Sequence, residues 1–96
     1  MKSMFVYILQ CNDDSYYTGV TSDIERRIWE HSNPIDFNSY VSKRLPFELV
    51  YCAEFYGDPK QAIAFEKQVK GWTRAKKEAL IKSDWDEISK LAKRRT

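Results

Sequence analysis

The pattern of hydrophobic and polar positions divides the chain into short strands and helices. Runs rich in aromatic and β-branched residues predict strands over residues 4–10, 16–20 and 47–55. Turn-forming residues at 12–15 separate the first two runs, so these strands should pair antiparallel. Periodic segments predict helices over about 22–31, 59–70, 74–82 and 84–93.

The predicted element order is β-β-α-β-α-α-α. This order is typical of a small α/β (α+β) domain in which a three-stranded antiparallel sheet is flanked by helices. Two of the helix starts carry clear local signals. Ser22 and Glu25 have the spacing of a capping box, and Asp58 stands before Pro59 as an N-cap before a first-position proline. Thr73 is positioned to cap the helix that follows it.

Length and composition limit the architecture and the compartment. The chain has 96 residues, of which 43% are hydrophobic and 15% aromatic, and this favours one packed domain over residues 1–96. We expect a core over about 3–82 and a C-terminal helix over about 84–93. No run is long and apolar enough for a membrane span or a secretion signal, so we expect a cytoplasmic protein without a membrane partner. Two cysteines and one histidine are too few for a structural zinc site.

The charge is unevenly distributed along the chain. Residues 1–50 hold five Lys and Arg against seven Asp and Glu, a net charge of −2. Residues 51–96 hold eleven against seven, a net charge of +4. A basic half fits a polyanionic partner such as a nucleic acid, but it is also common on solvated helices.

The helix expected at 22–31 places a basic pair beside an apolar stripe. At 100° per residue, Ile24 and Ile28 mark the stripe, and Arg27 and His31 lie next to it, one helical turn apart. A cation and an imidazole at the edge of an apolar face are costly unless an anion is bound there. The alternative is that Arg27 snorkels or pairs with a nearby carboxylate while His31 fills the edge of the core.

Glu66 is the corresponding feature of the helix expected at 59–70. It falls inside an apolar arc formed by Ala62, Phe65, Val69 and Trp72 and extended by Ile63. An inward carboxylate needs a cation, a metal ion or a raised pKa. Lys70, four residues further on, is a purely structural partner that would serve equally well. Tyr7 and Tyr17, on adjacent predicted strands, likewise have packing as their commoner role.

The order and spacing of these residues resemble those of the GIY-YIG nuclease family. Phe5-Val6-Tyr7 stands where that family has Gly-Ile-Tyr, and Tyr17-Thr18-Gly19 stands where it has Tyr-Ile-Gly. Arg27 follows Gly19 by eight residues, as the family's arginine does, and His31 matches a histidine present in several members. Glu66 matches a glutamate on a later helix. The resemblance covers residues 3–82 and is nearest to small bacterial single-domain members, which are similar to the N-terminal domain of the excision-repair incision subunit.

This resemblance implies an endonuclease that hydrolyses phosphodiester bonds in DNA with one divalent metal ion. Glu66 would hold the ion, which we expect to be Mg²⁺, and Arg27 would offer its planar fork to the phosphate. Tyr7, Tyr17 or His31 would position or deprotonate the attacking water, and a tyrosine in that role needs nearby positive charge. Gly19 would serve through the backbone of its motif.

Basic side chains outside the motifs are candidates for contacts with the nucleic-acid backbone. They would give binding that depends on salt and little on sequence. These candidates are Lys43, Arg44, Lys67, Lys70, Arg74, Lys76 and Lys77. The expected partner is DNA, branched or nicked, in repair or recombination, with a protein partner as a source of specificity.

Two departures from the family pattern keep a second function open. Phe5 replaces the glycine of the first motif, and no asparagine occurs beyond Asn38, although several members carry one after the metal-binding helix. The alternative is therefore a catalytically weak or inactive nucleic-acid-binding module of the same fold.

Overall fold

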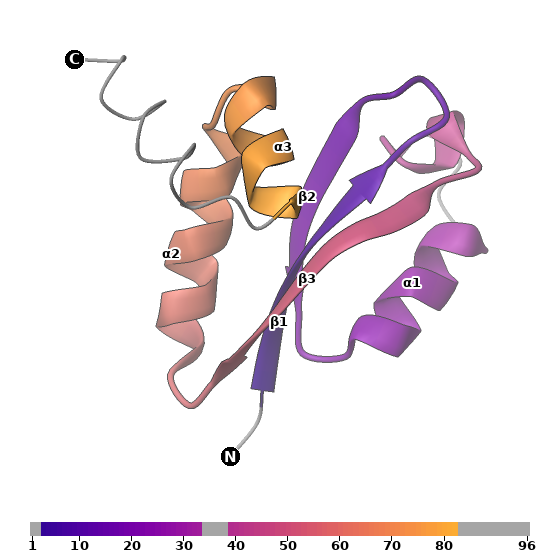
Figure 1. Ribbon diagram of the computed structural model, residues 1–96. Helices are drawn as coiled ribbons and strands as arrows, with labels where there is room; N and C mark the ends of the chain where they lie inside the picture. Colours follow the sequence, from indigo (N-terminus) through magenta and orange to yellow (C-terminus); the bar gives the residue numbers. More distant parts are fainter. Residues whose placement is uncertain (1–2, 34–38, 83–96) are drawn as a thin grey trace.

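A three-stranded antiparallel sheet forms the centre of the molecule, as predicted. The computed structural model describes residues 3–33 and 39–82, and its strands are β1 (Ser3–Gln10), β2 (Tyr16–Thr21) and β3 (Glu48–Tyr56). The sheet order is β2-β1-β3, so the first strand of the chain lies between the other two (Figure 1). β1 pairs antiparallel with both neighbours, which leaves β2 and β3 as edge strands.

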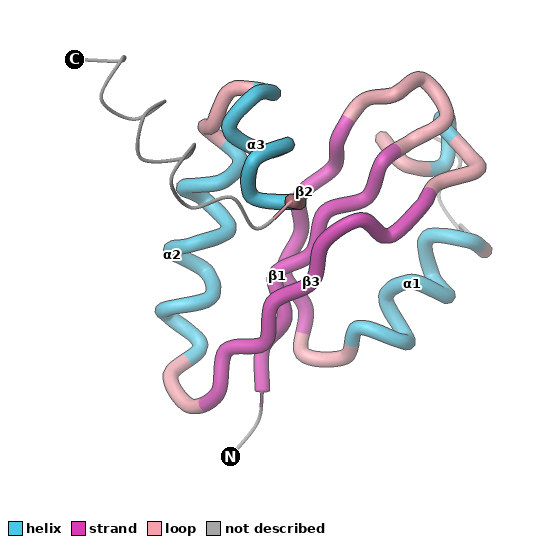
Figure 2. Tube along the Cα trace, viewed as in Figure 1, coloured by secondary structure: helices cyan, strands magenta, loops and turns pink. Residues whose placement is uncertain are grey.

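Helices cover the sheet on both sides. They are α1 (Ile24–Ser32), α2 (Pro59–Lys70) and α3 (Arg74–Ile81), and a 3-10 turn, η1 (Ser42–Arg44), was not predicted. α1 lies on one side of the sheet, whereas α2 and α3 lie on the other (Figures 1 and 2). The helix expected at 84–93 falls outside the described residues. No helix in the described parts of the chain is both long and apolar enough to span a bilayer.

The start of α1 differs from the predicted capping box. Asp23, not Ser22, is the N-cap, and its carboxylate accepts a hydrogen bond from the backbone N–H of Arg26 at 3.1 Å. The backbone N–H of Asp23 in turn donates to the Thr21 hydroxyl at 3.1 Å. The helix therefore begins one residue later than the spacing suggested, and Glu25 lies in the first turn, where the helix dipole favours a carboxylate.

The predicted starts of the other two helices are confirmed. Asp58 accepts a hydrogen bond from the backbone N–H of Lys60 at 2.9 Å, and the hydroxyl of Thr73 accepts one from that of Lys76 at 3.3 Å. One expectation for α2 is wrong, because Ile63 is 40% exposed instead of packed. It lies at the border of the apolar arc, beyond the surface that the sheet covers.

Strand alternation separates two cores, one on each face of the sheet. Ile8 on β1 packs with Val69, Ala79 and Leu80 beneath α2 and α3. Its neighbours Tyr7 and Leu9 point to the opposite face, which α1 covers, and share a second cluster with Val41. The first core is purely aliphatic at its centre, whereas the second includes a buried phenol.

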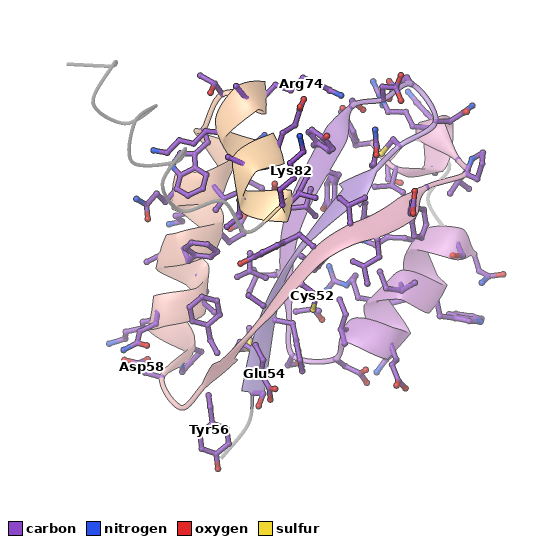
Figure 3. All side chains as sticks on the ribbon, viewed as in Figure 1. Cys52, Glu54, Tyr56, Asp58, Arg74 and Lys82 are labelled. Carbon is purple, nitrogen blue, oxygen red and sulfur yellow. The ribbon has the colours of Figure 1, made fainter. Side chains whose placement is uncertain are left out.

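A cation holds α3 to the turn between β1 and β2. The guanidinium of Arg74 donates to the carbonyl oxygen of Asp14 at 2.6 Å and lies over the ring of Tyr16, with Cζ 4.5 Å from the ring centroid. It also pairs with Glu78 at 3.0 Å. Figure 3 labels Arg74 at the start of α3. Arg74 therefore joins two segments that are far apart in the sequence.

Candidate active site

The core on the α1 face contains a hydrogen bond between two of the predicted site residues. The hydroxyl of Tyr7, on the central strand, lies 2.9 Å from Nε2 of His31 in the last turn of α1. The helix brings His31 over the sheet because Ile24 and Ile28, on the same side of α1, pack against the cluster that contains Tyr7. Tyr7 is completely buried, whereas His31 is only partly so.

Tyr17 completes a compact group of three rings. Its ring centroid lies 6.3 Å from that of Tyr7 and 5.4 Å from that of His31, which it meets edge to face. Tyr17 is half-buried on the edge strand β2, so it is the tyrosine of the pair that remains open to solvent. Tyr7 and Tyr17 therefore face the same side of the sheet.

Gly19 provides the space that the ring of Tyr7 occupies. The two residues are directly opposite each other in the β1–β2 register. A Cβ atom on Gly19 would lie 2.5 Å from Cζ of Tyr7, far inside van der Waals contact. The glycine of the second motif is therefore required by the tyrosine of the first, because only a residue without a side chain lets the phenol cross the neighbouring strand.

Burial fixes the protonation of the hydrogen-bonded pair. The pKa of Tyr7 is raised to about 12, first by burial and then by Tyr17, while Arg27 acts in the opposite direction. The pKa of His31 is lowered, first by burial and then by the charge of Arg27. At neutral pH, Tyr7 is therefore protonated and His31 is neutral. The two groups share one hydrogen bond, and its donor is set by which imidazole nitrogen carries the proton.

Arg27 lies beside this group, on the same side of α1. Its charge acts on both Tyr7 and His31, which places the guanidinium next to both. Nε of Arg27 is buried 3.4 Å from Oε1 of Glu30, and within the described parts of the chain it has no hydrogen-bond partner. Part of the guanidinium is exposed, and its binding capacity is not saturated by Glu30, so an anion such as a phosphate group suits this position.

Glu66 is buried on α2, which packs against β1 and β2. Nζ of Lys70 lies 2.8 Å from Oε1 of Glu66, so the ion pair considered from the sequence is present. The pair raises the pKa of Lys70, and Tyr17 adds to this shift, which places Lys70 within electrostatic reach of the ring group. Oε1 itself lacks a hydrogen bond of good geometry.

These features of Glu66 fit a site with one carboxylate ligand. Its ion-pair partner among the described residues is Lys70, whose side chain is 56% exposed. Among residues 3–33 and 39–82, no three His, Cys, Asp or Glu side chains gather as a metal site. Mg²⁺ keeps most of its waters and is held in proteins by one or two carboxylates together with substrate phosphate. Glu66 matches that requirement.

The other basic side chains expected to contact nucleic acid differ in how far contacts within the protein already engage them. Arg74 is occupied by Asp14 and Tyr16 as described above, and Lys76 is only 7% exposed, with Nζ 4.3 Å from the ring centroid of Trp72. Burial lowers the pKa of Lys77. Lys43 and Lys67 are exposed, and neither has an ion-pair partner among the described residues. These two are best placed to contact a phosphate backbone.

Two ring partners of the site were not predicted. Tyr40 stacks on Tyr17 with centroids 5.9 Å apart and an interplanar angle of 29°. Phe47 meets His31 edge to face at 6.1 Å. Tyr40 lies in the stretch between α1 and β3, which carries no periodic pattern. Phe47 begins the strand expected over 47–55 and lies one residue before β3, but nothing in that pattern indicated a contact with His31.

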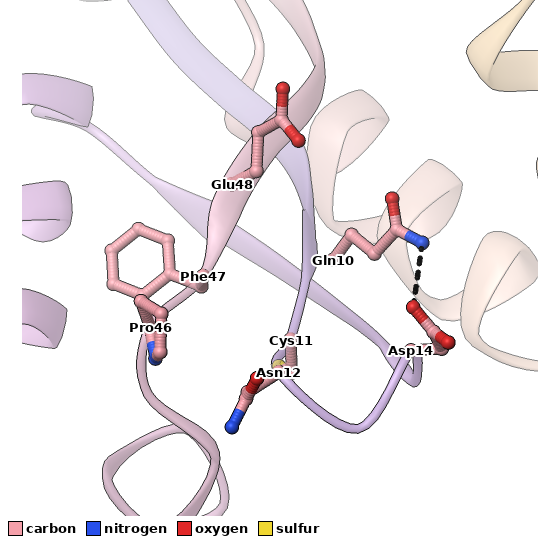
Figure 4. A pocket seen from close by; sticks show the side chains of 7 residues that line it. All are labelled: Gln10, Cys11, Asn12, Asp14, Pro46, Phe47 and Glu48. Atoms are coloured by element: carbon pink, nitrogen blue, oxygen red, sulfur yellow. Dashed lines mark hydrogen bonds between the residues drawn. The ribbon is translucent and has the colours of Figure 1, made fainter.

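A hollow of about 360 Å³ lies beyond Phe47, at the end of the sheet (Figure 4). Gln10 and Asp14 face each other there, with a side-chain hydrogen bond of 3.5 Å. The residues that line the hollow are Gln10, Cys11, Asn12, Asp14, Pro46, Phe47 and Glu48. Because its ionisable groups include two carboxylates and no cation, this hollow is unsuited to a phosphate.

Comparison with known proteins identifies the arrangement. Residues 3–79 match the model of the GIY-YIG catalytic domain. This chain belongs to the GIY-YIG family. Members of this family are generally nucleases that bind nucleic acid and use a divalent metal ion.

The relatives in sequence are small UPF0213 proteins. One from Haloquadratum walsbyi is 39% identical over 82 residues, which cover 85% of this chain and 90% of that protein. One from Staphylococcus aureus is 42% identical over 82 residues, which cover 85% and 98%.

Two solved structures share the fold. The solution NMR structure of a UPF0213 protein from Bacillus halodurans has a TM-score of 0.56 at 35% identity and covers 93% of this chain and 96% of that one. The solution NMR structure of protein EF2693 from E. faecalis has a TM-score of 0.61 at 30% identity and covers 86% of each chain. The family, the fold and the order of the motifs therefore agree.

Proposed function

We propose that this protein is an endonuclease that hydrolyses phosphodiester bonds in DNA with one divalent metal ion. The observation that carries the proposal is the ring group of Tyr7, Tyr17 and His31, assembled beside the unsaturated guanidinium of Arg27. Burying a phenol and an imidazole has a desolvation cost that an aliphatic core would not have, and the hydrogen bond between them offsets part of it.

The hydrogen bonding and burial of the three rings suggest a separate role for each of them. Because Tyr7 and His31 are hydrogen-bonded to each other and Tyr7 is completely buried, neither is well placed to take a proton from water. Tyr17 is the open member, and we assign to it the contact with the attacking water. Tyr7 and His31 then hold Tyr17 on one side, and Arg27 and Lys70 supply the positive charge that a tyrosine base requires.

Phosphate binding and metal binding fall to different elements. Arg27 on α1 binds the oxygens of the scissile phosphate through its planar fork. Glu66 on α2 would hold the metal ion, and Lys70, which pairs with that carboxylate at 2.8 Å, would then pair with the phosphate. A bound Mg²⁺ supplies charge neutralisation at the phosphate. Lys43 and Lys67 add contacts to the backbone that are independent of sequence.

Cleavage of purified DNA substrates tests the proposal. Branched, nicked and single-stranded DNA are incubated with and without Mg²⁺, using the wild type, Arg27→Ala and Glu66→Gln. Arg26→Ala is the control for Arg27→Ala, because Arg26 is exposed on the same helix and belongs to an i,i+4 ion pair. Glu78→Gln is the control for Glu66→Gln, because Glu78 is half-exposed on the neighbouring helix α3 and also belongs to an i,i+4 ion pair. We expect Mg²⁺-dependent cleavage by the wild type and both controls, and a loss of about a hundredfold or more in the two site variants.

The same DNA substrates distinguish the nuclease from the alternative, a nucleic-acid-binding module without activity. If the wild type binds DNA but cuts no faster than Arg27→Ala and Glu66→Gln, the protein is a binding module and the enzymatic proposal is wrong. A filter-binding or anisotropy assay on the same DNA measures binding without cleavage. Raising the salt concentration should weaken binding in either case, because phosphate contacts release counterions.

A further inference from the structure

A stack of three planar groups leads from the candidate active site to the surface. Tyr17 is its inner member, and the ring of Tyr40 lies almost parallel to it at 5.9 Å and 29°. The guanidinium of Arg44 lies over the ring of Tyr40, with Cζ 3.8 Å from the centroid. The ring of Tyr40 therefore has a cation and a phenol as its two stacking neighbours, and it is 41% exposed.

The outer member of this stack is fixed by several independent contacts. Nε of Arg44 donates to Oδ2 of Asp13 at 2.9 Å, and a terminal nitrogen donates to the carbonyl oxygen of Tyr40 at 2.9 Å. The carbonyl oxygen of Arg44 accepts a hydrogen bond from the backbone N–H of Asn12 at 2.9 Å. Arg44 is thus bound to the β1–β2 turn through both its side chain and its backbone.

Asp13 is in turn held as a carboxylate. Its Oδ1 accepts hydrogen bonds from the hydroxyl of Ser15 at 2.5 Å and from the backbone N–H of Ser15 at 3.1 Å. These bonds, and then Arg44, keep the pKa of Asp13 below its usual value. The charge of Arg44 is therefore matched within the protein, and its fork is engaged, so it is poorly suited to the phosphate contact expected from the sequence.

Tyr17 is the site residue that most needs such support. It lies on β2, whose backbone pairs with β1 alone among residues 3–33 and 39–82. Edge strands are held on one side only, and a half-exposed tyrosine there has rotamer freedom that packing must remove. On the inner side, Tyr7 and His31 contact the ring. On the outer side, Tyr40 is its stacking partner.

We propose that Tyr40 and Arg44 are positioning residues for Tyr17. Arg44 fixes the ring of Tyr40 against the turn, and Tyr40 fixes the ring of Tyr17 in the orientation that its contact with water requires. This inference rests on the proposed nuclease function, in which Tyr17 is the residue that meets the attacking water. A displacement of about 1 Å in a reacting group lowers rates by about a hundredfold.

Four variants separate positioning from DNA contact. Tyr40→Leu removes the stacked ring and Tyr40→Phe keeps it. Arg44→Lys keeps the charge and loses the planar fork, and Arg44→Ala loses both. Tyr56→Leu and Arg26→Lys are matched controls, because Tyr56 is 70% exposed and the side chain of Arg26 is 75% exposed, away from the stack. The measurements are kcat and KM for cleavage of nicked DNA, and the ring NMR signals of Tyr17 in protein labelled at tyrosine without DNA.

Positioning predicts a fall in kcat with little change in KM. We expect Tyr40→Leu and Arg44→Ala to lower kcat by about tenfold to a hundredfold. Tyr40→Phe should keep the kcat of the wild type. The kcat of Arg44→Lys should lie between those of the wild type and Arg44→Ala. The ring signals of Tyr17 should shift in Tyr40→Leu and both Arg44 variants, but not in Tyr40→Phe or the controls.

Other results would overturn the proposal. A rise in KM with unchanged kcat in the Arg44 variants would mean that Arg44 contacts DNA directly. Unchanged Tyr17 signals in both Arg44 variants, which keep the ring of Tyr40 and its ring current, would mean that Arg44 and Tyr40 do not hold the ring of Tyr17. Because the NMR measurement requires neither DNA nor cleavage, it decides the positioning role even if the wild type cuts no substrate, a result that would contradict the proposed function instead.

Discussion

Tyr16 and Tyr17 are adjacent on β2, yet they belong to the two opposite faces of the sheet. Tyr16 packs at the aliphatic core beneath α2 and α3, where the cation of Arg74 lies over its ring. Tyr17 belongs to the α1 face, where its neighbours are a buried phenol, an imidazole and a second stacked tyrosine. One face joins the helices to the sheet, and the other arranges polar rings at defined angles.

The difference shows how a small domain separates stability from chemistry. Burying Tyr7 and His31 requires a hydrogen bond between them and the absence of a side chain at Gly19. The core of Ile8, Val69 and Leu80 has no polar group to satisfy, so its burial contributes to stability without such conditions. Alternation along the strands is sufficient to place both kinds of residue in one sheet.

The largest expected effect is on the cleavage rate, and it should distinguish the two neighbouring tyrosines. Tyr17→Phe removes the hydroxyl assigned to the attacking water and should lower the cleavage rate by about 10²- to 10⁴-fold, the usual contribution of a general base. Tyr16→Phe removes the same atom on the other face and should leave the rate unchanged. Single-turnover cleavage of nicked DNA measures both. Equal rates for the two variants would remove Tyr17 from the mechanism.

The second effect concerns the free energy of unfolding, which should depend more on the core beneath α2 and α3 than on the α1 face. Leu80→Ala deletes a completely buried side chain and should lower the free energy of unfolding by about 2–5 kcal/mol. Tyr7→Phe keeps the ring and loses one hydrogen bond, at a cost of about 1 kcal/mol. Urea denaturation followed by circular dichroism measures both. If Tyr7→Phe were the more destabilising change, the α1 face would be the main stabilising core.

The third effect tests the close approach between the two motifs. Gly19→Ala forces a methyl group against the buried ring of Tyr7, which is held by His31, and should cost about 1–3 kcal/mol. Gly71→Ala is the matched control, because the nearest atom to its added Cβ lies 3.6 Å away and its φ of −81° suits any residue. Thermal denaturation of the two variants gives the comparison. Equal stabilities would show that the Tyr7 ring can move aside freely.

Much of the fold was predictable because it depends on local signals. Strand alternation gave the sheet, and Asp58 and Thr73 gave two helix starts at the correct residues. Asp23 replaced Ser22 as a cap because two adjacent residues were both able to cap, and contacts with Thr21 decided between them. The packing of Ile63 was wrongly predicted because a helical wheel does not show where the sheet ends.

The candidate site was predictable only as far as periodicity and the family pattern reach. Tyr7, Tyr17 and His31 were correctly placed together, because alternation and the 3.6-residue repeat fix which way they point. Tyr40 was missed because it lies in a stretch without periodicity. Phe47 was assigned to a strand but not to the site, because only tertiary contacts bring its ring to His31. The roles of Arg44 and Lys76 depend on partners that are distant in sequence or buried, which no local pattern records.

The smallest expected effect is the pH dependence contributed by His31. Its pKa in the folded protein lies below the ordinary value of 6.5, so the unfolded chain binds the proton more readily. Keeping His31 neutral therefore stabilises the folded protein fully at pH values above 6.5, the pKa of the unfolded chain. This stability is lost as the pH falls from 6.5 through the lower pKa of the folded protein. Burial and Arg27 cause this shift, while Glu30 opposes it.

A comparison of variants isolates this contribution. Thermal denaturation of the wild type and His31→Gln is measured at about pH 7.5 and about pH 5.5. The wild type should lose more stability on acidification than His31→Gln, because glutamine keeps a hydrogen-bonding group near Tyr7 and does not titrate. A control titration of Tyr16→Phe should follow the wild type. Identical losses in the wild type and His31→Gln would mean that the imidazole is as easily protonated in the folded protein as in the unfolded chain.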